Sequence, residues 1–427
     1  MLKAIRGTKD ILPGDTGIWQ YLERSARDIF GKYGYREIRT PVFEDAALFI
    51  RSIGKETDII QKEMYVFSDR GSRTIALRPE ATACIVRAFL ENSLGNEKDV
   101  TKLYYIGPMF RSERPQKGRQ RQFHQLGVEG IGSDNPFLDV EIISLSVRFL
   151  QKIGVKNFTL KINSLGCQDD KKIVMEKNRD NIKPHLSLLC SECNVRYNKN
   201  ALRIFDCKEA KCRDVVRNIK FELESLLCEE CTTHFNSVKE GLDTLGIPYV
   251  VDSKIVRGLD YYTRTVFEII HSQLGAKDAI CAGGRYNNLI QELGGKYSPA
   301  IGFAFGIERL ILALNEKIPA ANNPEMNVFI AIAGKGLYRE AFKLTDSLRQ
   351  KGISCDIDYE ERSLKAQMKK AERLQARFVI IFGEEEFRRN RVVVRDMINR
   401  QQKEVDVMKV GDELNPVYGQ AAEWRKI

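Results

Sequence analysis

The pattern of hydrophobic positions predicts helices and antiparallel strands in the first part of the chain. Apolar residues recur at helical spacing over 17–33 and 81–92, which indicates two amphipathic helices. Short runs rich in β-branched and aromatic residues, bounded by turn residues, predict strands at 33–44, 63–69, 74–80, 102–110 and 122–132. Neighbouring strands joined by turns pair antiparallel, so the expected fold class is α+β, with helices packed on an antiparallel sheet.

The pattern changes between residues 167 and 247, where Lys, Glu, Asn and Cys occur at helical spacing and strand signals nearly vanish. We expect this stretch to be a helical insertion. Strand signals resume over 248–270, and residues 299–314 are predicted as a strand that runs into a helix.

A second change of composition, over 315–327, brings Pro, Asn and Ala together and is typical of a linker. Beyond it, apolar runs alternate with two amphipathic helices, which predicts a small three-layer α/β domain. The expected organisation is a first domain over 1–320 that contains the insertion 167–247, followed by a second domain over 325–427.

The composition limits the class of protein. Hydrophobic residues make up 43% and charged residues 30% of the 427 positions, which excludes a mainly disordered chain. No apolar run approaches the roughly 18 residues of a membrane span, and the first residues lack the pattern of a secretory signal, so the cytoplasm is the expected location. Lys and Arg exceed Asp and Glu by 68 to 58, a surplus that suits a polyanionic partner.

The segment YIGPMFRSERPQKGRQRQFHQLGVEGIG carries the strongest local signal for a site. In a hairpin, the two-residue period places Arg111 and Glu113 on one face, and Phe123, Gln125 and Glu129 together on one face of the returning strand. Such a face suits a ligand cavity, with Arg for phosphate oxygens, carboxylates for an ammonium or imidazole, and Phe for stacking on a base. The alternative is a solvated face, and the basic loop between the strands either closes over an anion or lies in water.

Two segments with acidic residues add candidate ligands. In TIALRPEATA, Glu80 and Thr82 follow a strand, where side chains commonly line a site, although a helix N-cap by Thr82 explains them equally well. In GFAFGIERL, Arg309 follows Glu308 in the first turn of a helix, which suits an anion, although a surface arginine is the commoner case.

Two further segments centre on glycine. VRGLDYYTRTVFE places Arg257, Tyr261 and Tyr262 near a glycine, although adjacent tyrosines are also ordinary strand residues. AICAGGRYNNLI allows close backbone approach at Gly283 and Gly284, although paired glycines most often form a turn.

Taken in order and spacing, these segments carry a family resemblance. REIRTPVFE, FRSERPQKGRQRQFHQLGVE and GFAFGIERL resemble the three signature motifs of class II aminoacyl-tRNA synthetases. VRGLDYYTRTVFE and AGGRYNNLI resemble the two stretches peculiar to histidyl-tRNA synthetases, and the similarity extends from AIRGTKDILPG to RSLKAQMKKAERLQARFVIIFGEEE. The resemblance implies a class II catalytic domain with a helical insertion and a C-terminal α/β anticodon-binding domain.

The resemblance also implies roles for residues at the nucleotide. Arg111 matches the arginine that binds the ATP α-phosphate, and Arg309 matches an arginine on the other side of the nucleotide. Glu113 matches a group near the adenine amino group, Phe123 the ring that stacks on adenine, and Arg119 a side chain that reaches toward the γ-phosphate.

A further set is implied for the amino acid and for tRNA. Glu80, Thr82 and Gln125 match the groups around the α-ammonium, while Glu129 and Tyr262, with Tyr261 beside them, match those that hold the imidazole. Arg257 matches an arginine that stabilises the α-phosphate during attack, and Arg114 and Gln116 match loop residues that meet the acceptor end of tRNA.

The implied activity is that of a histidine–tRNA ligase, which forms histidyl-adenylate from L-histidine and ATP with Mg²⁺ and then charges tRNA(His). Pro41, expected within an edge strand of the first motif, favours a homodimer. Two other functions remain open at this stage: a synthetase-like regulatory protein without the reaction, and a class II synthetase for another amino acid. The presence of Arg111, Arg257 and Arg309 opposes the first, and the RGLDYY run opposes the second.

The insertion holds three close cysteine pairs: Cys190 and Cys193, Cys207 and Cys212, Cys228 and Cys231. In a cytosolic protein such pairs indicate metal binding rather than disulfides, and two CxxC pairs are enough for a tetrahedral Zn²⁺ site. The candidate ligands are Cys190, Cys193, Cys228 and Cys231, although six cysteines do not say which four serve, and plain buried thiols are the alternative. The resemblance implies no catalytic metal here and assigns the insertion to the acceptor arm of tRNA.

Overall fold

The computed structural model describes residues 2–96, 99–116, 118–199, 201, 204, 207, 209–219, 224–255, 259–274, 279–314 and 327–414. It divides into two compact units, unit 1 over Met1–Pro319 and unit 2 over Ala320–Ile427. Within the described residues, no helix is both long and apolar enough to span a bilayer.

Unit 1 is built on an eight-stranded sheet with the order β1-β5-β6-β11-β10-β9-β7-β8. Its strands are β1 (Arg36–Glu37), β5 (Thr101–Phe110), β6 (Gln122–Ile131), β7 (Phe158–Ser164), β8 (Val250–Val251), β9 (Thr263–His271), β10 (Ala279–Arg285) and β11 (Ala300–Gly306). The six central strands pair antiparallel, whereas the short outer strands β1 and β8 pair parallel with their neighbours. The predicted α+β class with an antiparallel sheet is confirmed.

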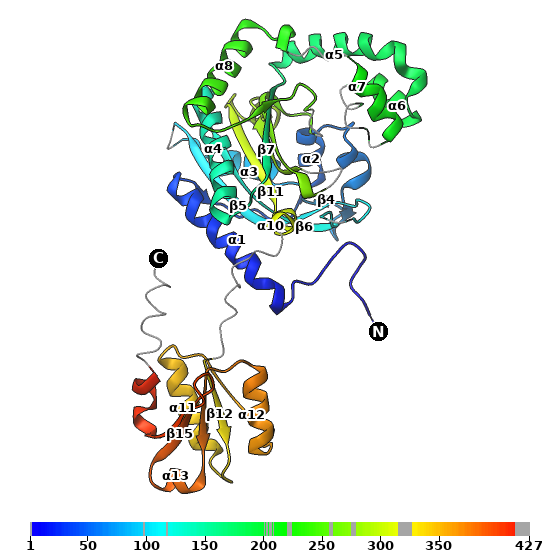
Figure 1. Cartoon of the computed structure of the whole chain (residues 1–427). Coiled ribbons are helices and arrows are strands. Elements are labelled where there is room, and N and C mark those ends of the chain that lie inside the picture. Colours follow the sequence, from blue (N-terminus) through cyan, green and yellow to red (C-terminus); the bar gives the residue numbers. More distant parts are fainter. Residues whose placement is uncertain are drawn as a thin grey trace. The chain divides into compact units, whose positions relative to one another are not determined.

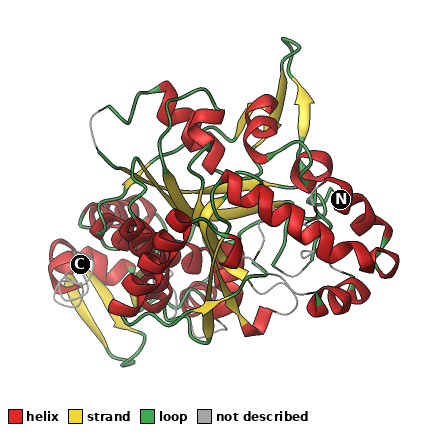
Figure 2. Ribbon diagram, turned by 90° about the horizontal axis from the view of Figure 1, so that it is seen from above, coloured by secondary structure: helices red, strands yellow, loops and turns green. Residues whose placement is uncertain are grey.

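One face of this sheet is covered by helices. The covering helices are α1 (Pro13–Lys32), α4 (Pro136–Ile153), α8 (Glu229–Thr244) and α10 (Ile307–Leu314). Their apolar side chains form the largest core together with Tyr104, Leu126 and Val128 of β5 and β6. Figure 1 labels these four helices, and Figure 2 shows helices (red) packed around the strands (yellow) of the sheet. Because side chains alternate along a strand, the odd-numbered residues of β5 and β6 point to the other face.

The second face carries smaller elements. They are α2 (Ala46–Ile53), the π-helix η1 (Ile59–Glu63), α3 (Thr82–Glu91) and α9 (Leu289–Glu292). The short η5 (Ser272–Leu274) instead contacts α10, and its Leu274 packs against the main core. The part of the chain between α1 and α3 also forms a three-stranded sheet of order β2-β4-β3. Its strands are β2 (Phe43–Asp45), β3 (Val66–Ser68) and β4 (Thr74–Leu77). β3 and β4 form the predicted hairpin. The strand expected over 33–44 is instead split into β1 and β2, and Pro41 lies between them because it cannot donate to a ladder.

The stretch 167–247 is helical, as its periodicity predicts, but it contributes to two different cores. Its elements are α5 (Gln168–Ile182), η2 (Lys183–Leu188), α6 (Ser191–Lys199), α7 (Ala210–Asn218), η4 (Glu224–Leu226) and α8. Buried residues between Ile182 and Ile219 form a small cluster of their own. Phe235, Val238 and Leu242 of α8 instead join the main core against the sheet.

Unit 2 is a five-stranded sheet of order β13-β12-β14-β15-β16 with helices packed on it. The strands are β12 (Val328–Ile332), β13 (Cys355–Ile357), β14 (Phe378–Phe382), β15 (Arg391–Asp396) and β16 (Gln402–Asp406). The helices are α11 (Tyr338–Gln350), α12 (Leu364–Arg373), α13 (Glu384–Arg388) and η6 (Val407–Lys409). β12, β13 and β14 pair parallel, in agreement with the predicted α/β architecture, and β15 and β16 add an antiparallel ribbon.

Candidate active site

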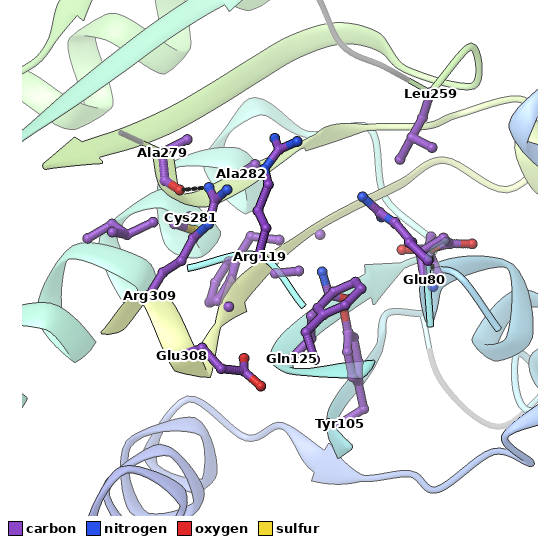
Figure 3. Close-up of a pocket in the computed structure, with 18 of the residues that line it drawn as sticks. Glu80, Tyr105, Arg119, Gln125, Leu259, Ala279, Cys281, Ala282, Glu308 and Arg309 are labelled. Atoms are coloured by element: carbon purple, nitrogen blue, oxygen red, sulfur yellow. Dashed lines mark hydrogen bonds between the residues drawn. The ribbon is translucent and has the colours of Figure 1, made fainter. Parts of the chain in front are cut away.

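A cavity opens on the face of the large sheet that the main helices leave free. Its walls come from β5, β6, β10 and β11, from the loop 111–121, and from the start of α3. Arg119 and Arg309 lie at one end of this cavity and Glu80 at the other (Figure 3). The two ends therefore differ in charge.

Arg111 opens the loop after β5 and is fixed by three contacts. Its Nε donates to the carbonyl of Pro79 at 2.9 Å, and its guanidinium lies 5.4 Å from the ring centroid of Phe123. Its backbone N–H donates to the Arg121 carbonyl at 2.8 Å, which closes the loop. The side chain was expected on a strand face, but β5 ends at Phe110, so Arg111 and Glu113 belong to the loop and line the cavity from there.

The basic end contains the guanidinium groups of Arg119 and Arg309. Arg309, in the first turn of α10, donates through Nε to the Gly118 carbonyl at 3.2 Å and through Nη1 to the Ala279 carbonyl. Burial and the positive charges of Arg119 and Arg111 lower the pKa of Arg309. Glu113 pairs with Arg119. Two guanidinium groups and one carboxylate leave a net positive charge at this partly buried end, which favours a polyanionic ligand.

The opposite end is built around two buried carboxylates. The Glu80 carboxylate accepts the N–H groups of Thr82 at 2.6 Å and Ala83 at 2.9 Å, so it caps the first turn of α3. The Thr82 hydroxyl, expected as the alternative cap, instead donates to Glu129 at 2.7 Å. Tyr286 donates its hydroxyl to the other oxygen of Glu129 at 2.6 Å.

Glu129 is held in a nearly dry environment. Its residue is 1% exposed, and burial raises the pKa of its carboxyl from 4.5 to about 8, against the opposing effect of the hydrogen bonds from Tyr286 and Thr82. Gly302 on the neighbouring strand makes room for it, because a Cβ there would lie 1.8 Å from the Glu129 Oε2. A carboxyl tuned to titrate near neutral pH in a cavity is characteristic of a functional group.

Aromatic and amide groups complete this end. Tyr261 and Tyr262 are both buried, with ring centroids 4.8 Å apart. The Lys171 ammonium donates to the carbonyls of Asp260 and Tyr262 at 3.0 and 2.8 Å, which fixes the backbone that presents these rings. The Oε1 of Gln125 is buried and has no hydrogen-bond partner among the described residues. A ligand with a donor group would satisfy it.

Comparison with known families identifies this arrangement. The family described as Histidyl-tRNA synthetase matches residues 7–170 and 196–310, and the family described as Anticodon binding domain matches residues 327–415. The chain belongs to the histidyl-tRNA synthetase family. Within the first match, residues 171–195 are left out, and this stretch includes Cys190 and Cys193.

Relatives support this membership over nearly the whole length. The chain is 50% identical to the histidine–tRNA ligase of Desulforamulus reducens over 408 residues, covering 95% of this chain and 97% of the relative. It is 49% identical to that of Pelotomaculum thermopropionicum over 403 residues, covering 94% of each. The crystal structure of apo S. aureus histidyl-tRNA synthetase superposes with a TM-score of 0.79 at 38% identity, covering 97% of this chain and 99% of that one.

Most of the residues predicted from the motifs of this synthetase family meet in the cavity. They are Glu80, Thr82, Arg111, Glu113, Arg119, Phe123, Gln125, Glu129, Tyr261, Tyr262 and Arg309. Arg114 and Gln116 are exposed on the loop and do not line it. Arg257 lies outside the described residues.

The sequence motifs assign no role to several lining residues, among them Tyr105, Tyr286 and Glu308. Tyr286 directly follows the glycines and arginine of AICAGGRYNNLI. These glycines lie inside β10 rather than in a turn, and the expected close backbone approach is confirmed at Gly283, where a Cβ would lie 2.4 Å from the Gly302 carbonyl oxygen. Glu308 accepts the His124 N–H at 3.0 Å and so joins β6 to α10.

The predicted zinc ligand set is wrong. Cys190, Cys193, Cys228 and Cys231 do not converge: the first two lie with Cys207 and Cys212, whereas the last two lie with Cys167 and Asp170. The pair Cys190 and Cys193 therefore lies beside Cys207 and Cys212, and not beside the pair Cys228 and Cys231 as predicted.

Proposed function

We propose that the chain is a histidine–tRNA ligase, which activates L-histidine with MgATP and transfers it to the 3′ end of tRNA(His). The observation that carries this proposal is a single cavity that has guanidinium groups at one end and a Glu129–Tyr286–Thr82 hydrogen-bonded group at the other. One end suits a triphosphate and the other a small ligand with an imidazole and an ammonium group.

In the first step the histidine carboxylate attacks the α-phosphorus in line. A new P–O bond forms to the carboxylate, the bond to the bridging oxygen of pyrophosphate breaks, and histidyl-adenylate remains. Arg111 and Arg309 stabilise the charge on the phosphates, and Arg257 is assigned the α-phosphate by its motif. No covalent enzyme intermediate is needed.

The adenine is assigned to Phe123 and Glu113. Arg111 already lies over the ring of Phe123, so a base stacked there is close to the guanidinium that holds its phosphate. Arg119, paired with Glu113 in this structure, is assigned the γ-phosphate, which means that ATP exchanges one anionic partner of Arg119 for another.

Histidine recognition is assigned to the acidic end. Glu129 and Tyr262 can satisfy both ring nitrogens of an imidazole, which rejects amino acids of similar size that lack one of these bonds. Glu80, Thr82 and Gln125 surround the α-ammonium, and the unpartnered Gln125 Oε1 is an acceptor suited to it. Tyr261 packs beside Tyr262.

In the second step a ribose hydroxyl at the 3′ end of tRNA attacks the mixed anhydride, and AMP leaves. Arg114 and Gln116 are exposed on the loop that borders the cavity and are assigned the acceptor end.

Unit 2 is assigned the binding of the tRNA anticodon. Arg388, Arg389, Arg391 and Arg395 lie close together in sequence and form a basic run, but Arg389 and Arg391 both pair with Glu404. The stronger candidate surface is the hollow between α12 and β15, lined by Lys365, Lys369, Arg377, Arg395 and Arg400. Phosphate contacts there would position tRNA.

The test is ATP–pyrophosphate exchange with each of the amino acids in turn. Histidine alone is expected to support exchange, and aminoacylation of tRNA(His) is expected to follow. A well-folded chain that exchanges with no amino acid would instead support the synthetase-like regulator, and exchange with a different one would support another class II synthetase.

Replacing Tyr286 with Phe tests how the hydrogen bond from Tyr286 affects the pKa of Glu129. The hydroxyl of Tyr286 stabilises the charged carboxylate, so its loss is expected to raise the pKa of Glu129 further, by about one unit. If the carboxylate form accepts the imidazole N–H, the pH dependence of kcat/KM for histidine moves upward by this amount. An unchanged profile would contradict this use of Glu129.

We also propose a homodimer formed through the first-motif region. The three-stranded sheet exposes Phe43, Val66 and Phe67, which are 53%, 48% and 45% accessible in the single chain. Apolar side chains gathered on one small sheet favour a protein partner. Sedimentation velocity at micromolar concentration is expected to give the dimer, and Phe43→Glu with Phe67→Glu to give the monomer.

A further inference from the structure

Four cysteines of the insertion converge on one point. The Sγ atoms of Cys190, Cys193, Cys207 and Cys212 all lie within 4.8 Å of one another, and those of Cys190 and Cys207 are 3.9 Å apart. Four thiolates around one ion at about 2.3 Å would be separated by roughly 3.8 Å. The four sulfur atoms therefore already lie close to tetrahedral spacing.

Backbone amides point at two of these sulfur atoms. The Cys193 N–H donates to the Cys190 Sγ at 3.4 Å, within the CxxC turn that begins α6. The Cys190 N–H donates to the Cys212 Sγ at 3.2 Å, across to α7. Such donors stabilise negatively charged sulfur, which is the form that binds a metal.

We infer that Cys190, Cys193, Cys207 and Cys212 bind one Zn²⁺ ion with a structural role. A closed set of four sulfur ligands, three of them buried, leaves no open position for a substrate and suits Zn²⁺ at a structural site. The ion joins the start of α6, the start of α7 and the segment between them.

The small size of the surrounding core supports a metal. Apart from the cysteines, the cluster has six buried apolar members among the described residues: Ile182, Leu189, Ala201, Ile204, Val216 and Ile219. A segment of fewer than about 40 residues rarely holds its fold by apolar burial alone and usually needs a metal or a disulfide. Packed thiols behave as small apolar groups and would add little to such a core.

The second cysteine group has a different explanation. Both oxygens of Asp170 already accept backbone N–H groups, from Cys167 at 3.2 Å and from Cys228 at 3.1 Å, so this carboxylate joins the starts of α5 and α8. Cys228 is also exposed. We make no metal assignment there.

The inferred ion would fix the position of α6, and α6 contacts residues at η1. Glu192 and Arg196 of α6 pair with Lys62 and Asp58 at 3.1 and 3.0 Å, at η1. The carbonyl of Glu63, the last residue of η1, accepts the N–H of Ser112 at 2.6 Å in the loop after Arg111. The metal site is therefore connected through α6 and η1 to the loop that frames the cavity.

The test is zinc content of the full chain purified under reducing conditions without chelator. The double variant Cys193→Ser with Cys212→Ser is expected to contain one equivalent less zinc per chain than the unsubstituted protein. Cys355→Ala is the matched control, because Cys355 is a buried cysteine of unit 2 outside both groups, and its zinc content is expected to stay unchanged. This comparison does not depend on the ligase reaction.

A second measurement covers the case in which the double variant does not fold. In the unsubstituted protein, an organomercurial reagent is expected to release the zinc in proportion to thiol modification, while Co²⁺ in place of Zn²⁺ is expected to give the intense visible absorption of a tetrahedral thiolate site. Unsubstituted protein without zinc, or a folded double variant with an undiminished zinc content, would overturn the assignment.

Discussion

Replacing Arg111 with Ala is expected to lower histidine-dependent ATP–pyrophosphate exchange by about 10²- to 10³-fold, the loss typical for one preorganised charge at a transition state. Arg111 is held by the Pro79 carbonyl and by the ring of Phe123 before any ligand arrives. Its guanidinium therefore needs little reorganisation when negative charge develops on the α-phosphate. The loss is expected mainly in kcat, because this contact strengthens in the transition state.

Two further variants separate charge from geometry. Arg111→Lys keeps a positive charge but cannot offer two oriented donors while retaining the Pro79 contact, so an intermediate activity is expected. Arg148→Ala removes an exposed arginine of α4 that bonds locally to Gln151, and it is expected to leave exchange unchanged. Exchange by Arg111→Ala within a few-fold of the unsubstituted chain would refute the role given to Arg111.

Replacing Glu129 with Gln is expected to reduce kcat/KM for histidine by roughly 100-fold or more above about pH 8, where the carboxyl is charged, since a buried site that loses a charged acceptor leaves both ligand and protein groups unpaired. The glutamine keeps the shape of the side chain but offers one oxygen to Thr82, Tyr286 and the ligand together. Around pH 8 the pH dependence caused by this carboxyl is expected to disappear. If the Glu129→Gln variant were as active as the unsubstituted chain, the protonated acid would be the working form.

The same substitution has an expected effect on folding. The pKa of Glu129 is about 8 in the folded chain, against an ordinary value of 4.5, so the folded state binds an extra proton between these values. The unfolding free energy of the unsubstituted protein therefore falls as pH rises through this window, by roughly 5 kcal/mol at most. Glu129→Gln lacks this slope. Urea denaturation at pH 5 and pH 8 measures the difference, and parallel pH profiles would contradict the raised pKa.

Local periodicity was sufficient for the part of the site that lies on β6. Phe123, Gln125 and Glu129 are separated by even numbers of residues, so a strand must put them on one face whatever its partners are. Tyr286 carries no such signal. It follows a register shift at Gly284 and Arg285, and only the surrounding sheet decides that its hydroxyl reaches Glu129.

The cysteines show a second limit of local patterns. Sequence spacing found the close pairs, but which pairs meet is decided by contacts between distant helix starts. Asp170 is an example, because it accepts the amides of Cys167 and Cys228, and Cys228 lies with these residues and not with Cys190. The longer helical and strand patterns, by contrast, predicted the folds of both units because burial on one face requires a regular period.

Glu80 gives the amino-acid end of the cavity an evolutionary constraint. Its carboxylate both faces the cavity and caps α3 through the amides of Thr82 and Ala83. A substitution that removed the side-chain acceptor at this position would also leave the amides of Thr82 and Ala83 uncapped, at a cost of about 1 kcal/mol or more. A change of amino-acid specificity that began with such a mutation of Glu80 would thus produce a less stable protein. Amino-acid selectivity at this position is therefore resistant to single mutations of this kind.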